Sequence, residues 1–374
     1  MAIDWTKSMK QTYEFYIVNP VNGNNIKKLD TVISASVSRD ITTDTQVSGS
    51  IEYDGELDEE YVRIYLVAEQ SGEIEKIPLI TMLCQTPSTS FNGKRKTTSI
   101  TGYSPLIELQ NVYPPLGYTI PSMAMNPNTN LGELIPSICE DNMRMKVLTM
   151  PQDESMVRLT QQVLAQAYVS DPSRSWFDLV QDLLGMTSYK ARVDELGKIF
   201  FEKTQPIAQM TPIYTFDSNN SSILSSDISI DRDLYGIPNV IEVIVTLLDG
   251  SSISAVAIND DKNSAASTTS RGRKVVQRVI NPDNLGKLSN DSEGKERAIE
   301  YANELLEQAS TLEYKISYKH GYCGNNIGDC VRINYPQAGI NNEKAYVVSQ
   351  KIDCKTGCTV EETAILTKKL FVRK

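Results

Sequence analysis

The chain has 374 residues, 40% of them hydrophobic and 22% charged, which is ordinary for a folded protein of about two to four domains. The formal net charge is −10, and this acidic balance disfavours tight DNA binding, in which Lys and Arg neutralise phosphates. The longest apolar stretch, Ile237–Leu248, contains Glu242 and is far shorter than the roughly 18–20 residues of a membrane helix. The N-terminus lacks the basic and apolar regions of a signal peptide. We therefore expect a protein made and folded in a cytoplasm, without membrane insertion or specific nucleic-acid binding.

Residues 11–103 predict an all-β domain, because runs of β-branched and aromatic residues alternate with turn residues at the spacing of a small barrel or sandwich. The predicted strands are Tyr13–Val18, Val32–Ser38, Val47–Tyr53, Val62–Ala68, Ile74–Cys84 and Lys96–Tyr103. Six of the nine residues in Glu52–Glu60 are acids, but their order differs from that of a calcium-binding loop. We interpret this stretch as a solvated loop, with a surface facing a lumen or a partner as the alternative.

Residues 118–206 follow a linker at 111–117 and are predicted to be rich in helices. Asn130 and Glu133 have the spacing of a helix N-terminus, and Pro136 is expected to limit or kink that helix. A second helix begins near Ser173, and its apolar face includes Trp176, which is a core residue or, alternatively, the anchor of a ligand groove. A hairpin is expected at 188–202.

Strands return from about residue 212, with predicted segments at 213–216, 223–230, 237–248 and 253–258. Residues 259–270 are polar and are expected to be mobile. The basic cluster Arg271–Lys274 is short and lacks aromatic neighbours, which favours a salt-bridging loop end or a subunit contact over nucleic-acid binding. An amphipathic helix is predicted at 291–311, and strands continue to Leu366. The apolar face of this helix comprises Ala298, Ala302, Leu305, Leu306 and Ala309.

The sequence singles out no catalytic or cofactor-binding residue. Its one histidine, His320, lies at the end of a predicted strand beside Gly321, which favours a partly exposed structural role. The metalloprotease, nucleophile-elbow and phosphate-loop motifs are absent. Acidic residues are abundant, but no pair stands out as the two carboxylates of a glycosidase.

Six cysteines occur, and four of them fall within 36 residues: Cys323, Cys330, Cys354 and Cys358. Without an export signal, free thiols are expected. Buried small hydrophobic residues are the favoured interpretation, and no metal ligand is assigned. A zinc or iron–sulfur site and a disulfide between Cys354 and Cys358 remain alternatives.

The order of motifs in the chain resembles that of the baseplate or tail hub proteins of phages, including the late-control D proteins of contractile phages and the hubs of related bacteriocins. Ile237–Val243 matches the family's I-P-N-V-I-x-V strand, and Arg271–Val275 matches its R-G-R-x-V loop. An Ala-rich helix follows at 298–309, and then come a G-D-x-V-x-I strand at Gly328–Ile333 and a Y-x-V strand at Tyr346–Val348. The helix and hairpin at 173–202 are similar to the family's intermediate domain.

This resemblance implies a mainly β fold with α+β insertions, built from two similar antiparallel β-barrel domains of the tail-tube type and two peripheral α+β domains. The first barrel corresponds to residues 1–111, and the second is split between 207–250 and 310–374. The helix-rich domain corresponds to 112–206, and an inserted loop–helix domain corresponds to 251–309.

The resemblance also implies a non-enzymatic homotrimer that forms a pseudo-sixfold ring and lets DNA pass. Its implied partners are the tail tube or a distal tail hexamer, a central spike or tail-tip protein, and a tape measure protein. The implied location is the virion tail, after assembly in the host cytoplasm. The sequence does not distinguish a contractile tail, a non-contractile tail and a bacteriocin.

Two other functions remain open: a tail-tip peptidoglycan hydrolase, which needs paired acids in a cleft, and a host-carbohydrate-binding module, which needs exposed aromatic residues. The charge distribution offers one further expectation. Residues 310–374 carry ten Lys and Arg against six acids, while the rest of the chain is acidic. A basic second barrel could therefore contact the acidic first barrel of the next subunit, and high salt would weaken that contact.

Overall fold

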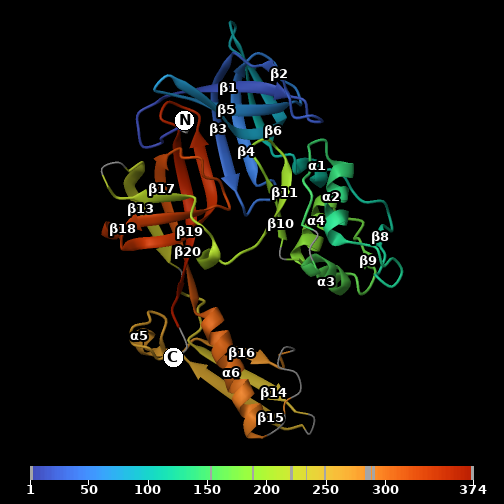
Figure 1. Ribbon diagram of the computed structural model, residues 1–374, viewed down its shortest axis with the longest axis vertical. Coiled ribbons are helices and arrows are strands. Elements are labelled where there is room, and N and C mark those ends of the chain that lie inside the picture. The colour runs from blue at the N-terminus through green and yellow to red at the C-terminus, as the bar shows by residue number, and fades with distance from the viewer. Residues whose placement is uncertain are drawn as a thin grey trace. The chain divides into compact units, whose positions relative to one another are not determined.

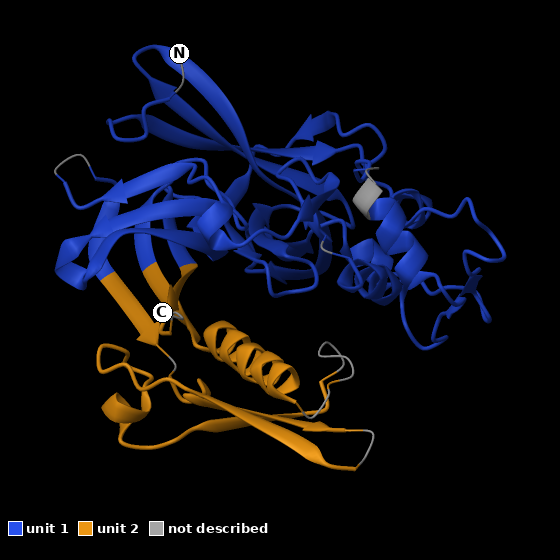
Figure 2. Ribbon diagram, turned by 60° about the horizontal axis from the view of Figure 1, so that its bottom comes forward, with its two compact units in different colours: residues 1–227, 318–363 blue, residues 228–317, 364–374 orange. Residues whose placement is uncertain are grey.

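The computed structural model describes residues 3–371, except 152–153, 188, 220–221, 233, 248–249, 283–287 and 289–290. Strands make up 44% of it and helices 18%, so the protein is mainly β with α+β insertions, as the sequence predicts. The chain forms two compact units, which Figure 2 colours separately. Unit 1 contains residues 1–227 and 318–363, and unit 2 contains residues 228–317 and 364–374.

The first β region of unit 1 is antiparallel, and its strands pair in the order β3-β4-β7-β6-β5-β1-β2 (Figure 1). Val62, Ile64 and Leu66 of β5 are fully buried at alternate positions, which is the period of a strand with one face on a core. The strands are β1 (Lys10–Val18), β2 (Asn25–Lys28), β3 (Val32–Asp40), β4 (Val47–Asp54), β5 (Tyr61–Gln70), β6 (Glu73–Phe91) and β7 (Lys96–Tyr103).

The C-terminal β region continues the same sheet. Its strands follow the order β13-β17-β20-β19, with β18 pairing with β19 and β12 pairing with β18. Residues 349–353 of β19 pair with residues 36–40 of β3, so this one pairing joins the two β regions. The strands are β12 (Tyr214–Asp217), β13 (Leu224–Arg232), β17 (Thr311–Gly321), β18 (Cys330–Tyr335), β19 (Ile340–Asp353) and β20 (Thr359–Lys369).

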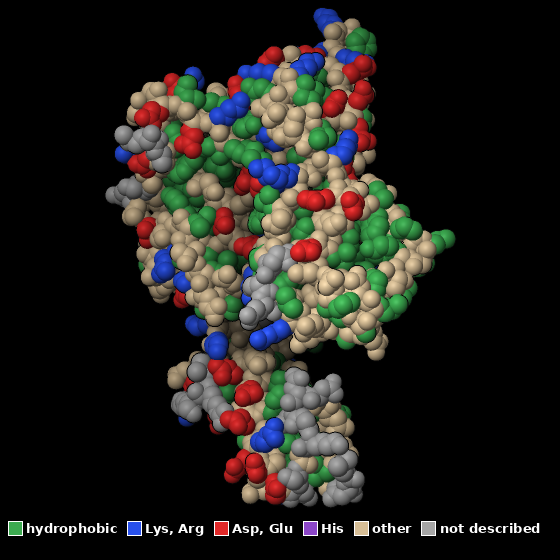
Figure 3. All heavy atoms as spheres, turned by 45° about the vertical axis from the view of Figure 1, so that its right-hand side comes forward, with side chains coloured by type: hydrophobic (Ala, Val, Ile, Leu, Met, Phe, Trp, Pro, Cys, Tyr) green, Lys and Arg blue, Asp and Glu red, His purple; other side chains and the backbone are tan. Residues whose placement is uncertain are grey.

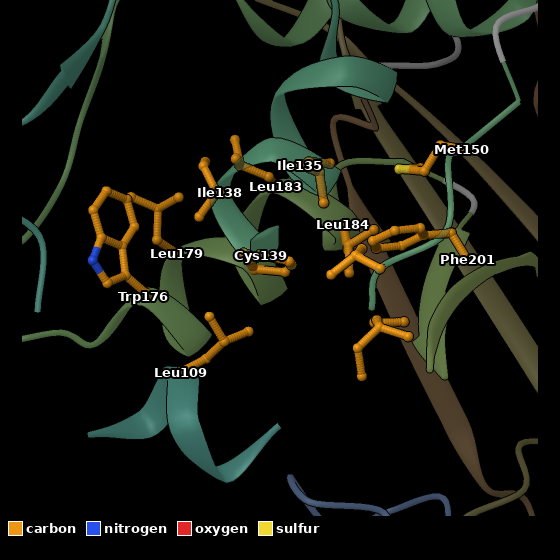
Figure 4. Close-up of a cluster of buried hydrophobic side chains, with 14 of the residues drawn as sticks. Leu109, Ile135, Ile138, Cys139, Met150, Trp176, Leu179, Leu183, Leu184 and Phe201 are labelled. Atoms are coloured by element: carbon orange, nitrogen blue, oxygen red, sulfur yellow. The ribbon is translucent and has the colours of Figure 1, made fainter. Parts of the chain in front are cut away.

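The helix-rich region of unit 1 has its own apolar core, in which α2 and α4 pack together (Figure 4). Ser175 and Asp178 form a reciprocal capping box, so α4 begins at Trp176. Asn130 caps α2 by accepting a hydrogen bond from the Gly132 amide, and α2 continues through Pro136. The elements are α1 (Ile107–Gln110), β8 (Thr119–Ile120), α2 (Leu131–Asn142), α3 (Glu154–Val163), β9 (Tyr168–Val169), α4 (Trp176–Gly185), β10 (Tyr189–Val193) and β11 (Ile199–Lys203).

Trp176 belongs to this core, and its ring meets that of Tyr118 edge-on at a centroid distance of 4.9 Å. The core interpretation of Trp176 is thus confirmed. The expected hairpin is β10 and β11, with residue 188 outside the described part of the chain. Among the described residues, short 3-10 helices lie at Ile207–Gln209 and Pro336–Ala338. Of the helices in the described residues, none has both the length and the apolar content needed to cross a membrane.

Unit 2 is a three-stranded sheet with one long helix on one of its faces (Figure 2). The central β14 pairs with β15 in antiparallel fashion and with β16 in parallel. Fully buried Ala298, Ala302 and Leu306 bring α6 against the strands, because small side chains allow a close approach. The elements are β14 (Val240–Thr246), β15 (Ser252–Ile258), α5 (Thr268–Arg271), β16 (Val276–Ile280) and α6 (Ser292–Ala309).

Unit 2 corrects two expectations. The strand at 237–248 was predicted to belong to the split barrel, but β14 is the central strand of this small sheet. Strand partners depend on tertiary pairing, which an apolar run does not specify. The polar segment 259–270 was expected to be mobile, but Asn259, Ala266 and Ser267 are fully buried. The Asn239 amide nitrogen donates to the Ala266 carbonyl at 3.1 Å, so buried side chains satisfy the segment's backbone groups.

Candidate functional site

Glu362, on β20, is the centre of a buried polar network in unit 1. Its carboxylate accepts hydrogen bonds from the Tyr318 hydroxyl and, at 2.6 Å each, from the side-chain amides of Asn325 and Gln350. Nε2 of His320 lies 3.3 Å from the same carboxylate, and the His320 and Glu362 side chains are fully buried. Buried polar groups require such partners in place of water, and here four side chains surround one carboxylate.

The network extends into the first β region and the helix-rich region. Arg39 faces Gln350 across the β3–β19 pairing, and its Nη1 donates to the Gln350 Oε1 at 2.9 Å. Arg39 also donates to the Leu79 carbonyl at 2.6 Å and lies 3.9 Å from the carboxylate of Glu195, in the β10–β11 turn. Glu195 in turn accepts a 2.6 Å hydrogen bond from the Asn326 side chain. Three regions that are distant in sequence therefore meet at one set of polar contacts.

His320 is buried, which corrects the expected partly exposed position. Along β17, Ile316, Tyr318 and His320 occupy alternate positions and point into the same core. The imidazole packs against the Phe216 ring at a centroid distance of 4.7 Å, and its Nδ1 lies 2.7 Å from the Gly321 carbonyl oxygen. Burial raises the pKa of the Tyr318 hydroxyl well above its ordinary value, and the Glu362 carboxylate adds to that shift. The network therefore connects β17, β19 and β20 through the core of unit 1.

The cavities of unit 1 can be compared with the needs of a hydrolase, which requires room for a substrate and paired carboxyl groups. The one next to Arg39 and Glu195 measures about 10 Å³, which is no larger than a single water molecule requires. A larger hollow of about 540 Å³ lies between the β3–β4 loop and α4, and Asp44 is the single acid among its lining residues. Hydrolysis of a glycosidic bond commonly uses two carboxyl groups, one on each side of the bond. The residues that line this cavity provide one carboxyl group, that of Asp44.

Gly328, in the G-D-x-V-x-I motif, has a φ of +86° and lies directly against Arg192. A Cβ at this position would overlap the Arg192 guanidinium, which donates a hydrogen bond to the Ile327 carbonyl oxygen. The next residue, Asp329, accepts a 2.6 Å hydrogen bond from the Asn326 amide. The glycine is therefore required both by the backbone conformation and by the close approach of an arginine from β10.

The basic cluster has a structural role at its first residue. Arg271 donates to the carbonyl oxygens of Ile237, at 2.7 Å, and Leu234, so it fastens the loop to the segment before β14. These contacts are to backbone oxygens within the same unit. Arg273 and Lys274 are exposed.

The acidic stretch Glu52–Glu60 forms ion pairs with cations of the same unit. Asp54 lies 2.8 Å from Arg95, Glu56 pairs with Lys96, and Glu59 lies 3.6 Å from Arg144. Leu57 is buried and anchors the stretch. Three of its six acids therefore pair with basic residues.

All six cysteines are free thiols, and five are buried. Burial raises the pKa of each thiol, to about 12 for Cys84, Cys139 and Cys354. Cys354 and Cys358 therefore do not form the disulfide considered above. Within the described parts of the chain, His, Cys, Asp and Glu side chains form no group of three placed to hold a metal ion.

Sequence reasoning did not identify the residues of the network other than His320. One signal was available for Arg39, which continues the buried positions Ala35 and Val37 of β3. An arginine in an inward register position indicates a buried partner. The identity of that partner depends on which strand lies beside β3.

The fold is similar to those of solved phage tail proteins. A tail protein from Neisseria meningitidis MC58 aligns with a TM-score of 0.56 and 8% identity over 96% of this chain and 97% of the other. The 43 kDa tail protein of prophage MuSo2 from Shewanella oneidensis aligns with a TM-score of 0.58 and 10% identity over 95% and 98%.

A third similar structure is the Francisella PdpA–VgrG complex, with a TM-score of 0.57 and 10% identity over 98% of this chain and 60% of the other. No protein-family model and no curated protein sequence matches the chain. At these identities the likeness concerns the fold, so the chain has the fold of phage tail proteins along nearly its whole length.

Proposed function

We propose that this protein is a structural hub in the tail of a phage or phage-like particle. It assembles as a homotrimer whose pseudo-sixfold ring connects a hexameric tail tube to a trimeric spike or tail tip. The observation that carries the proposal is the likeness to two tail proteins, each aligned over 95% or more of both chains. A fold shared along the whole length supports a shared architectural role more strongly than a shared motif would.

The two β regions would be the tube-type elements of this ring. One is formed by β1 to β7, and the other by β12, β13 and β17 to β20, without the strand β14. Three chains would then present six such elements, which is how a trimer can match a sixfold tube. The β3–β19 pairing and the network around Glu362 would hold the two elements of one subunit at a constant angle.

A non-enzymatic role agrees with the geometry of unit 1. Glu362 and His320, which would be candidates for acid–base chemistry by residue type, are enclosed by the core. Trp5 packs edge-on against Tyr322 at 5.2 Å and Trp176 lies in a core, so both tryptophans are engaged within the chain. The partners would be the tube or distal tail hexamer, the spike or tail-tip protein and the tape measure protein, and the location would be the virion tail.

Electron microscopy of the purified protein, alone and with the neighbouring tail proteins, tests the hub. Averaged end-on views should have threefold symmetry with six similar lobes around an open channel. Light scattering should give the mass of three chains. A protein that is monomeric at high concentration and absent from tail particles as a trimer would contradict the hub. Release of soluble fragments from purified cell walls would instead favour the peptidoglycan hydrolase.

A further inference from the structure

The sheet of unit 2 has an apolar face on the side opposite α6. Ile241, Val243 and Ala255 point toward α6, so the alternate positions of β14, β15 and β16 point away from it. These positions hold Val and Ile at six of eleven places: Val240, Ile244, Val256, Ile258, Val276 and Ile280. Val240 is buried and Ile244 is half-buried, so we call the four exposed residues, Val256, Ile258, Val276 and Ile280, the sheet surface. The other five outward places hold polar or charged residues, so apolar residues make up the larger part of this face, where a sheet in contact with water normally has polar ones.

The sheet surface is exposed and has no net charge. Val276 and Ile280 are 51% and 62% exposed, and Val256 and Ile258 are nearly as accessible. The outward positions include one acid and one base, Glu242 and Arg278, which pair at 2.8 Å.

A second exposed apolar surface lies on the helix-rich region of unit 1. No charged residue occurs between Glu108 and Glu133, in a chain that is 22% charged. Leu116 and Met125 in this segment are 88% and 77% exposed, and Tyr113 is also exposed. Val169, which pairs with Thr119 of the same segment, is also exposed. We call these residues the loop surface, and Figure 3 shows this region at the right as mostly green and tan spheres.

Net charge limits where two copies of this chain can meet. Each copy carries −10, so contact between average surfaces is opposed by electrostatic repulsion. The loop surface has no charges, and the charged residues at the outward positions of the unit 2 sheet, Glu242 and Arg278, pair with each other. Interface centres are likewise poor in charged residues and enriched in aromatic residues and Met. The two surfaces therefore match each other in chemistry.

Symmetry gives a reason for a chain to have two different surfaces. A closed trimer is built from head-to-tail contacts, in which one surface of a subunit binds a different surface of the next. We infer that the sheet surface of one copy binds the loop surface of the next copy. This inference rests on the proposed homotrimer and identifies the side chains that close its ring.

Two double variants test the inference. One carries Val276→Asp and Ile280→Asp in the sheet surface, and the other carries Leu116→Asp and Met125→Asp in the loop surface. Ile74→Asp is the matched control, because Ile74 is an exposed apolar residue, 68% accessible, outside both surfaces. Each double variant should weaken association at least about tenfold and give monomers by light scattering. The control should remain trimeric, and circular dichroism should be unchanged in all three proteins.

Mixing the two double variants gives the sharper result. Each keeps the surface that the other has lost, so one intact contact can form and the mixture should yield a heterodimer that cannot close into a ring. If the contacts joined like surfaces, each variant alone would remain a dimer, and the inference would be overturned. Trimers that persist in both double variants would also overturn it while leaving the proposed hub intact. A monomeric wild type would overturn both proposals.

Salt dependence separates this arrangement from a ring held by charge. A contact between the basic C-terminal residues of one copy and acidic residues of the next would weaken at high salt and would survive all four substitutions. The contact proposed here should persist as NaCl is raised, because apolar burial does not depend on unscreened charge.

Discussion

Unit 1 and unit 2 are held together in different ways. Unit 1 joins segments from both ends of the chain through a few buried polar side chains, with Arg39 and Gln350 separated by 311 positions. The sheet and α6 of unit 2 come from one continuous segment, residues 240–309, and depend on the close packing of small side chains such as Ala298 and Ala302 between them. The stability of unit 1 should therefore depend strongly on single buried polar groups. The stability of unit 2 should depend on the volume of the side chains between α6 and the sheet.

The tryptophans allow this comparison to be measured. Trp5 and Trp176 are the two tryptophans of the chain, and both belong to unit 1. Their fluorescence reports the unfolding of unit 1, whereas far-ultraviolet circular dichroism reports both units.

The largest effect is expected for Glu362→Ala. The substitution leaves the His320, Asn325 and Gln350 side chains buried without their acceptor, which should lower the free energy of unfolding by about 3–5 kcal/mol. The tryptophan transition in urea should move to lower concentration. Glu361→Ala is the control, because the neighbouring Glu361 pairs with Lys319 at the exposed surface and should contribute at most about 1 kcal/mol. Equal effects of the two substitutions would contradict the role assigned to the network.

Gly328→Ala should follow, with a loss of about 3 kcal/mol from backbone strain at φ +86° and displacement of Arg192. Gly324→Ala is a matched control, since Gly324 has a φ of +83° with no atom within 4 Å of its added Cβ. In an Arg192→Ala background the two glycine substitutions should have equal effects. A persistent difference there would show that Arg192 is not the residue that requires Gly328.

Ala302→Leu tests the other side of the comparison. A larger side chain between α6 and the sheet should destabilise unit 2 by about 2 kcal/mol through overpacking. The circular dichroism transition should broaden or shift while the tryptophan transition stays in place. Gln308→Leu, at an exposed position of the same helix, should change neither signal. Parallel shifts of both signals after Ala302→Leu would mean that the two units unfold together.

The smallest effect concerns a surface ion pair of unit 1. Hydrogen bonds from Lys28 and Lys76 lower the pKa of Glu14 from 4.5 to about 2. A lowered carboxyl pKa stabilises the folded state above pH 4.5, and this contribution is lost as the pH falls toward 2. Wild type should therefore exceed Glu14→Gln in stability by less than about 1 kcal/mol at pH 7, with the difference vanishing near pH 2. A difference that stays constant with pH would show that charge is not its origin.

Local signals in the sequence were sufficient for several helices. The reciprocal contacts of Ser175 and Asp178 and the capping of α2 by Asn130 involve residues at most three positions apart. The apolar spacing of α6 likewise depends on neighbouring turns, and its predicted face at Ala298 and Ala302 is buried. The mainly β class follows from period-2 patterns of the same local kind.

Features that depend on strand partners were decided by the tertiary structure. The buried position of His320 needs the neighbouring strand that supplies Glu362, and the central position of β14 needs β15 and β16 on either side. The local sequence was enough to predict α2, α4, α6 and most of the strands, because those preferences arise within a few residues. Only the fold revealed the Arg39–Gln350 contact, the requirement for Gly328 and the uncovered sheet surface. Each depends on a contact between segments that are distant in the sequence, and such a contact produces no periodic pattern in either segment.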